Sequence, residues 1–129
     1  YVDACVWITL VEGLAEHRVP VRSALESSAQ EGWTLCTSDA VRLKVLIGPF
    51  RRQQAHLTAL YRDILEATRE LRVPSTVFAD ALPIAEAEGL RAMDAVHVAI
   101  AVHHRCERFV TTDPHFKDLR LISPRWVEL

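Results

Sequence analysis

Three aspartates of this 129-residue chain each lie at the end of an apolar run or at the start of a helical pattern. They are Asp3 in YVDACVWI, Asp94 in RAMDAVHVAIA and Asp113 in RFVTTDPHF. Carboxylate oxygens are the ligands that hard divalent cations such as Mg²⁺ prefer. Acids so far apart in sequence meet only in a folded domain, and a site that holds all three favours a divalent metal ion.

The elements that must position these acids alternate between short apolar runs and longer helical patterns. The pattern predicts strands at residues 1–6, 33–37, 71–74, 109–111 and 120–122. It predicts helices at residues 8–14, 20–30, 54–68 and 93–104, and a helical turn at 114–119. The face of the 20–30 helix is expected to carry Val21, Leu25 and Ala29.

Proline and glycine mark the limits of two further helices. One is capped by Ser38 or Asp39 and ends at Gly48 and Pro49, which makes residues 48–52 a corner between helices. The other begins at Ser75 and ends at Gly89, and a proline at position 83 should kink or split it.

Strands that alternate with helices indicate an α/β domain with three layers, α/β/α, and a mostly parallel sheet. We expect a single domain over residues 1–129. The carboxyl ends of the strands in such a sheet share one crevice. The three aspartates should therefore converge there, and the Ala- and Val-rich helix at 93–104 should pack centrally on the sheet.

Composition limits the possible functions. The net charge of −2 predicts no overall basic field, so any contact with nucleic acid must be local. Three cysteines without CxxC spacing indicate reduced thiols and a cytoplasmic protein. No apolar stretch approaches the roughly 20 residues that span a bilayer, so no membrane association is expected. Because the chain starts at Tyr1 rather than Met, we expect a residue or two to be missing at its front.

Each aspartate also has an explanation without chemistry. Asp94 can serve as a helix N-terminal acid favoured by the macrodipole. Asp113, which precedes Pro114, can serve as an ordinary N-cap. Asp3 in an apolar run needs a dedicated partner, because an unpaired buried charge is costly. Their joint placement favours the functional interpretation for all three.

Five segments, in this order, resemble the PIN-domain ribonucleases, in particular the VapC-type toxins of bacterial toxin–antitoxin modules. They are YVDACVWITLVEG, TSDAVRLK, GPFRR, LRAMDAVHVAIA and CERFVTTDPHF, and the resemblance extends over nearly the whole length of the chain. The resemblance implies a metal-dependent endoribonuclease in which acids bind Mg²⁺ or Mn²⁺ and RNA phosphodiesters are hydrolysed. It also implies a cognate antitoxin and a homodimer.

The resemblance assigns roles to particular positions. Asp3 matches the first acid of the family, Asp94 the third and Asp113 the fourth, whereas Ser38 and Thr111 match supporting hydroxyls that bond the acids or metal-bound waters. The second acid is a glutamate six residues after the serine, and this chain has Lys44 there.

A cation at the second acid position should weaken the metal site. Lys44 can lie across Asp3 and Asp94 as an internal counter-ion, or it can turn to solvent and leave three carboxylates. It marks either a degenerate member of the family or a disarming substitution in a toxic protein; the second is favoured because the other motifs are intact. The alternative function is a non-catalytic module that binds RNA or antitoxin. A nuclease acting on structured DNA is disfavoured, since the chain lacks large insertions to hold a duplex.

Other residues have weaker assignments. Arg42, Arg51 and Arg52 form either a solvated corner or a contact for RNA phosphates or for acidic groups of a partner. His97 is expected to pack under the site rather than bind metal. The helical surface that contains Leu57, Leu60 and Ile64 is the expected homodimer surface.

Overall fold

The structure, a computed structural model, describes residues 1–129. Along the chain lie α1 (Ala4–Glu12), α2 (Ala15–Gln30), β1 (Cys36–Ser38), α3 (Asp39–Arg51), α4 (Ala55–Glu66), β2 (Arg69–Leu71), α5 (Val77–Glu88), α6 (Ala92–His103), β3 (Arg108–Thr111), the 3₁₀ turn η1 (Pro114–Phe116) and β4 (Ser123–Trp126). The predicted α/β architecture with parallel strands is confirmed. None of the helices is long and apolar enough to cross a membrane.

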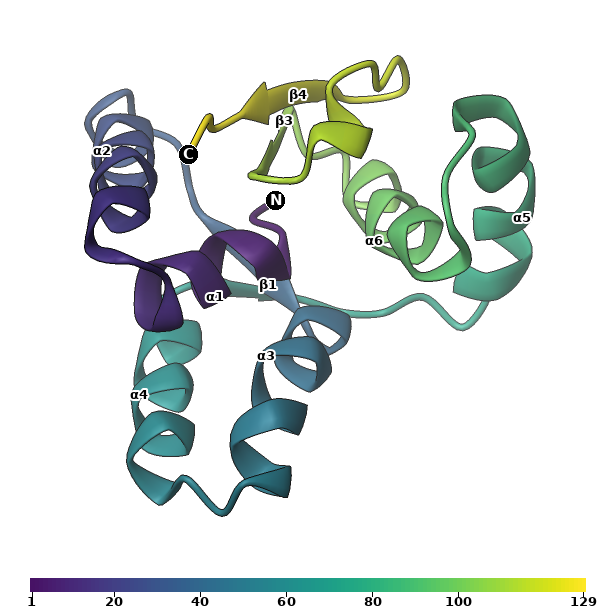
Figure 1. Ribbon diagram of the computed structural model, residues 1–129. Coiled ribbons are helices and arrows are strands. Elements are labelled where there is room, and N and C mark those ends of the chain that lie inside the picture. The colour runs from purple at the N-terminus through teal and green to yellow at the C-terminus, as the bar shows by residue number, and fades with distance from the viewer.

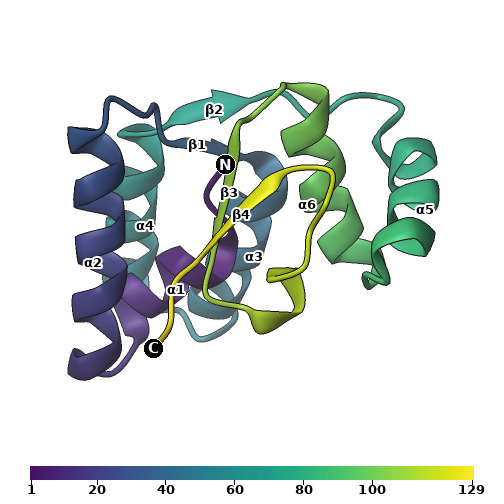
Figure 2. The ribbon, with the colours of Figure 1, turned by 90° about the horizontal axis from the view of Figure 1, so that it is seen from above.

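Residues 1–3 join two pairs of parallel strands. β1 pairs with β2, and β3 pairs with β4. The Val2 N–H donates to the Cys36 carbonyl (2.9 Å), the Asp3 N–H donates to the Val110 carbonyl (2.9 Å), and the Val110 N–H donates to the Tyr1 carbonyl (2.8 Å). The order across the molecule is therefore β2, β1, residues 1–3, β3 and β4, and Figure 2 shows the N-terminus between β1 and β3.

The helices flank these strands in pairs. α1 packs on α2, α3 on α4, and α5 on α6. Figure 1 places α5 at the outer edge of the molecule, beyond α6. Every residue from Ala95 to Ala101 in α6 is buried, which confirms the prediction of a central helix. The core joins these residues to Val2, Phe109 and Val110.

The predicted strand at residues 1–6 is wrong after Asp3. The Asp3 side chain accepts a hydrogen bond from the Ala4 N–H, and α1 begins there. Periodicity does not separate a short buried helix from a strand, because both are continuous apolar runs. The predicted helix end is close to that of α1, whose C-cap is Gly13.

The prediction that Gly48 and Pro49 end a helix is also wrong. α3 continues through both, and Pro49 is buried in its last turn. Loss of one main-chain hydrogen bond near a helix end is tolerated because proline already has a helical φ. The corner lies instead at residues 52–54, where Gln53 has a φ of +54°. Pro83 likewise lies inside α5, which is not split.

Other boundaries differ by a few residues. β1, β2 and β4 cover residues 36–38, 69–71 and 123–126 instead of 33–37, 71–74 and 120–122. Thr76, not Ser75, precedes α5. α2 begins five residues earlier than predicted and buries Ser28 rather than Ala29 beside Val21 and Leu25.

Gly89 closes α5 in the left-handed conformation (φ +66°). An added Cβ would meet no atom within 4 Å, so the cost of Gly89→Ala is the backbone conformation alone. We expect a loss of about 1 kcal/mol in the free energy of unfolding, measured by urea denaturation. Gly89→Asn should lose less, because asparagine tolerates this conformation. Equal stability of the alanine variant and the parent would contradict this explanation.

Candidate active site

Asp3 is buried, with 1% of its surface exposed, and its carboxylate is held by three donors. The Ala4 N–H donates to Oδ1 (2.6 Å), while the Cys5 thiol (3.0 Å) and the Thr111 hydroxyl (3.1 Å) donate to Oδ2. The pairing of residues 1–3 with β3 brings Thr111 beside Asp3. The dedicated partners that a buried carboxylate requires are therefore present.

Thr111 links Asp3 to Asp113. The Asp113 N–H donates to Thr111 Oγ1 (3.0 Å), so the residues at the end of β3 and the loop after it form one hydrogen-bonded unit. Asp113 also caps η1: its Oδ1 accepts from the His115 N–H (2.9 Å) and lies 2.7 Å from His115 Nδ1. Burial would raise the pKa of Asp113, but its contacts with His115 outweigh burial and hold this pKa below the usual value.

Asp94 lies in the first turn of α6, partly buried, with no hydrogen bond from within the protein. Burial raises the pKa of its carboxyl above the usual value; the Lys44 ammonium opposes this rise, and the Asp3 and Asp113 carboxylates add to it. Lys44, Asp3 and Asp113 thus influence Asp94 through their charges, without a hydrogen bond or an ion pair to its carboxylate.

Lys44 lies in α3 with an exposed side chain. It does not form an ion pair with any carboxylate. Its charge still acts on Asp94, Asp113 and His97, from a position open to solvent. Of the two arrangements considered for Lys44, the structure has the solvent-facing one.

Ser38 and His97 belong to a buried network beneath the acids. The Tyr1 hydroxyl lies 2.7 Å from Ser38 Oγ and 2.8 Å from His97 Nδ1. Ser38 therefore bonds Tyr1 and none of the three acids. His97 is fully buried, its Nε2 has no hydrogen-bond partner in the protein, and burial lowers its pKa.

The three candidate arginines do not form one cluster. Arg42 pairs with Asp39 (3.5 Å) and Glu70 (3.4 Å), and Arg52 pairs with Glu12 (3.1 Å). Arg51 is exposed and has no carboxylate partner. Two of the three are thus engaged within the fold.

The oxygen donors of the three acids and the nearby hydroxyls suit a hard metal ion, although they do not surround a single point. All the candidate donors are carboxylate or hydroxyl oxygens, and Asp94 and Asp113 Oδ2 are free of internal hydrogen bonds. However, no three acidic, histidine or cysteine side chains are placed closely enough to hold one metal ion. Mg²⁺ typically keeps several waters and takes only one or two carboxylates. The chemistry of the donors therefore suits a hydrated hard ion held by one or two carboxylates, but the side chains are not arranged as a three-ligand site.

The sequence pattern does not identify Cys5 or Tyr1 as neighbours of the acids and the hydroxyls. It predicts only an apolar strand at residues 1–6. The signal available was the position of Cys5, two residues after a buried aspartate, which lets its side chain reach the same carboxylate oxygen.

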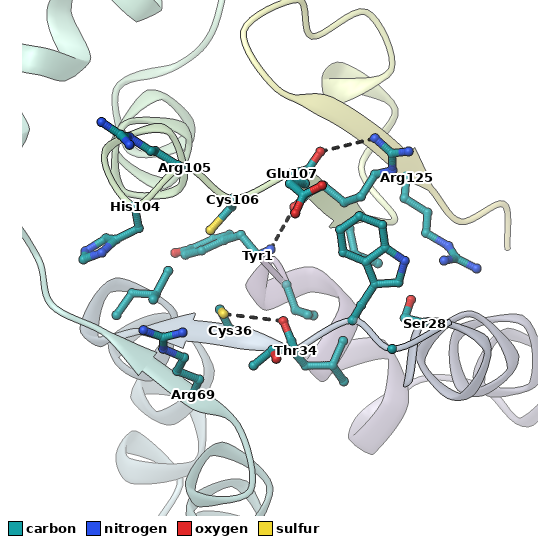
Figure 3. Close-up of a pocket in the computed structure, with 17 residues that line it drawn as sticks. Tyr1, Ser28, Thr34, Cys36, Arg69, His104, Arg105, Cys106, Glu107 and Arg125 are labelled. Carbon is teal, nitrogen blue, oxygen red and sulfur yellow. Dashed lines mark hydrogen bonds between the residues drawn. The ribbon is translucent and has the colours of Figure 1, made fainter. Parts of the chain in front are cut away.

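A separate cavity of about 320 Å³ lies where residues 1–3 enter the sheet (Figure 3). Cys36 and Cys106 line it from opposite sides of Tyr1, together with Arg69, Arg105 and other basic residues. None of the three aspartates lines this cavity. All three cysteines are free thiols, as predicted.

Comparison with protein families matches residues 1–121 to the PIN domain. The chain belongs to the PIN domain family. Among solved structures, a chain of a toxin–antitoxin complex from Klebsiella pneumoniae is similar, with a TM-score of 0.73 and 20% identity over 94% of this chain and 92% of that chain. A chain of VapBC2 from Rickettsia felis, bound to a DNA fragment from its promoter, has a TM-score of 0.78 and 14% identity over 98% and 97%. No curated protein matches the sequence.

The influence of Lys44 on Asp94 can be measured directly. Lys44→Met removes the charge that opposes the rise in the Asp94 pKa, so we expect that pKa to increase, and Lys44→Glu should increase it further. The measurement is an NMR titration of the Asp94 carboxyl carbon. Arg22→Met on α2 is the matched control and should leave the pKa of Asp94 unchanged.

Lys44→Met should also change the free energy of unfolding, by an amount that depends on the pH. A carboxyl whose folded pKa lies above its unfolded value destabilises the fold at neutral pH, and this contribution disappears as the pH falls through the folded pKa. Lys44→Met should therefore lower the free energy of unfolding at pH 7 more than at pH 3. An Asp94 pKa that is the same in parent and Lys44→Met would contradict the proximity of these groups.

Proposed function

We propose that this chain is a VapC-type toxin whose acidic crevice is the site of a metal-dependent endoribonuclease, held in a weakened state by Lys44. The observation that supports the proposal is the hydrogen-bonded unit of Asp3, Thr111 and Asp113, with Asp94 in electrostatic contact with both acids. The resemblance of the motifs and the match to the PIN domain support the reaction class, and the fold shared with chains of toxin–antitoxin complexes supports the toxin assignment.

Each residue has a distinct task in this proposal. Asp3, fixed by three donors, would hold Mg²⁺ or Mn²⁺ in a constant place, together with Asp94 and Asp113. When bound, the ion supplies an activated water and offsets the charge that builds on the phosphate. Thr111 orients Asp3 and the loop that carries Asp113. Burial raises the pKa of the Asp94 carboxyl, so a bound cation would stabilise its charged form.

The positive charge of Lys44 opposes the binding of a divalent cation by these acids. Its ammonium sits near acids whose mutual repulsion would otherwise be relieved by a divalent cation. A glutamate there would remove the competing charge and add an oxygen donor or an acceptor for metal-bound water.

Lys44→Glu should restore metal binding and RNA cleavage, and Asp94→Asn in that background should abolish both. The measurements are calorimetric Mn²⁺ titration and cleavage of a mixed RNA pool by the parent, the single variant and the double variant. We expect at least a tenfold gain in Mn²⁺ affinity for the single variant, as one added charged ligand is worth more than about 1.4 kcal/mol.

Arg22→Glu on the surface of α2 makes the same change in net charge away from the acids, and it should leave Mn²⁺ affinity unchanged. Cleavage by the parent at the rate of Lys44→Glu would show that the second acid position is dispensable, and the role given to Lys44 would then be wrong.

A second candidate function is a non-catalytic PIN module that binds RNA or antitoxin. The observation in its favour is that no three potential ligands are placed closely enough to hold an ion. Metal titration separates the two, because a binding module retains its RNA affinity without any divalent cation and Lys44→Glu would leave it catalytically inert.

The proposed partners are a cognate antitoxin and a second copy of the chain. Arg51 is the one candidate arginine without an internal partner, and it is available to an acidic group or a phosphate. The predicted homodimer surface is less exposed than expected: Leu60 is 37% exposed, and Leu57 and Ile64 are partly covered by neighbouring helices. Phe78 and Leu82 are each 74% exposed and belong to α5, the helix that lies at the edge of the molecule in Figure 1.

A homodimer is therefore expected to pair through α5 rather than α4. Phe78→Ser with Leu82→Ser should shift the sedimentation coefficient at micromolar concentration from dimer to monomer, because the apolar contact is lost. Leu60→Ser is the control and should leave the dimer intact. A monomeric parent at this concentration, without antitoxin, would contradict the proposal.

A further inference from the structure

We propose that Cys5 is a positioning residue of the acidic crevice, which fixes the Asp3 carboxylate relative to the main chain that leads to Asp113. The inference rests on the proposed function of this crevice and extends it to a residue outside the acids and hydroxyls of the family motif.

The Cys5 sulfur has three polar contacts, all within the crevice. Its thiol donates to Asp3 Oδ2 (3.0 Å), and its sulfur accepts from the Thr112 N–H (3.3 Å). It also lies 3.3 Å from Thr111 Oγ1. The sulfur thus contacts the acid that caps α1 and two consecutive residues at the end of β3, namely the last residue of the strand and the one after it, more than 100 positions away in sequence.

Cys5 and Thr111 act as a pair on one atom. Both donate to Asp3 Oδ2, while Oδ1 is bound by the Ala4 N–H. Thr111 in turn accepts from the Asp113 N–H, as the sulfur accepts from the Thr112 N–H. Two hydrogen-bonded bridges, one through Cys5 and one through Thr111, therefore connect Asp3 with the loop that carries Asp113.

Removal of the thiol would break one bridge. In Cys5→Ala, Asp3 Oδ2 keeps only the Thr111 donor, and the Thr112 N–H loses its acceptor. A carboxylate near a metal depends on such hydrogen bonds for its orientation, and loss of an outer hydrogen-bond partner typically costs 10–100-fold in metal affinity. Serine keeps both a donor and an acceptor at this position, so Cys5→Ser should restore the bridge.

The test uses the full chain in the Lys44→Glu background. Mn²⁺ affinity by calorimetry should fall at least about tenfold in Cys5→Ala and stay within about threefold of the background in Cys5→Ser. Cys106→Ala is the matched control: it makes the same chemical change at a half-buried thiol outside the crevice, and it should leave Mn²⁺ affinity unchanged.

Amide hydrogen exchange gives a readout that needs no metal. The Thr112 N–H should exchange faster in Cys5→Ala than in the parent, and at the parental rate in Cys5→Ser, with the exchange of α6 amides unchanged in both. If Lys44→Glu binds no Mn²⁺, the proposed function fails, yet this exchange pattern still supports the bridge. The proposal would be overturned if the Thr112 amide of Cys5→Ala exchanged at the parental rate. It would also be overturned if Cys5→Ser bound Mn²⁺ as weakly as Cys5→Ala.

Discussion

The main-chain hydrogen bonds of residues 1–3 hold the rest of the structure together. Without them, β1 with β2 and β3 with β4 would be two separate pairs, each too small to support helices on its faces. Because Val2 bonds β1 on one side and Asp3 bonds β3 on the other, Asp3 emerges between the two pairs and caps α1. The buried position of its carboxylate is thus a consequence of how the sheet is joined.

The same geometry explains which parts of the fold and site were predictable. The alternation of apolar runs and helical patterns was enough to predict the α/β class and the buried helix at Ala95–Ala101. Local rules failed at Asp3, where capping competes with strand formation, and at Pro49 and Pro83, where packing tolerates a missing hydrogen bond. The pairing of Cys5 with Thr111 depends on strand neighbours that no local pattern reveals.

The electrostatics of the crevice set a balance between folding and cation binding. Burial disfavours the charged form of Asp94 in the metal-free fold and raises its pKa, the charges of Asp3 and Asp113 add to this rise, and the Lys44 ammonium opposes it from a solvent-exposed position. The Lys44 ammonium cannot replace a divalent ion chemically, because it donates hydrogen bonds but does not lower the pKa of a bound water as a metal ion does. In the proposed function, Lys44 therefore stabilises the metal-free fold and weakens cation binding.

The most direct test of this account is the anomalous diffraction signal of Mn²⁺ in crystals of the Lys44→Glu variant. The account predicts a peak within ligand distance of at least two of the carboxylates of Asp3, Asp94 and Asp113, about 2.0–2.6 Å for a hard cation with oxygen ligands. Crystals of the parent grown under the same conditions should show a much weaker peak there. No peak at these acids in the variant, with Mn²⁺ bound elsewhere or not at all, would contradict the claim that this crevice is a metal-dependent nuclease site.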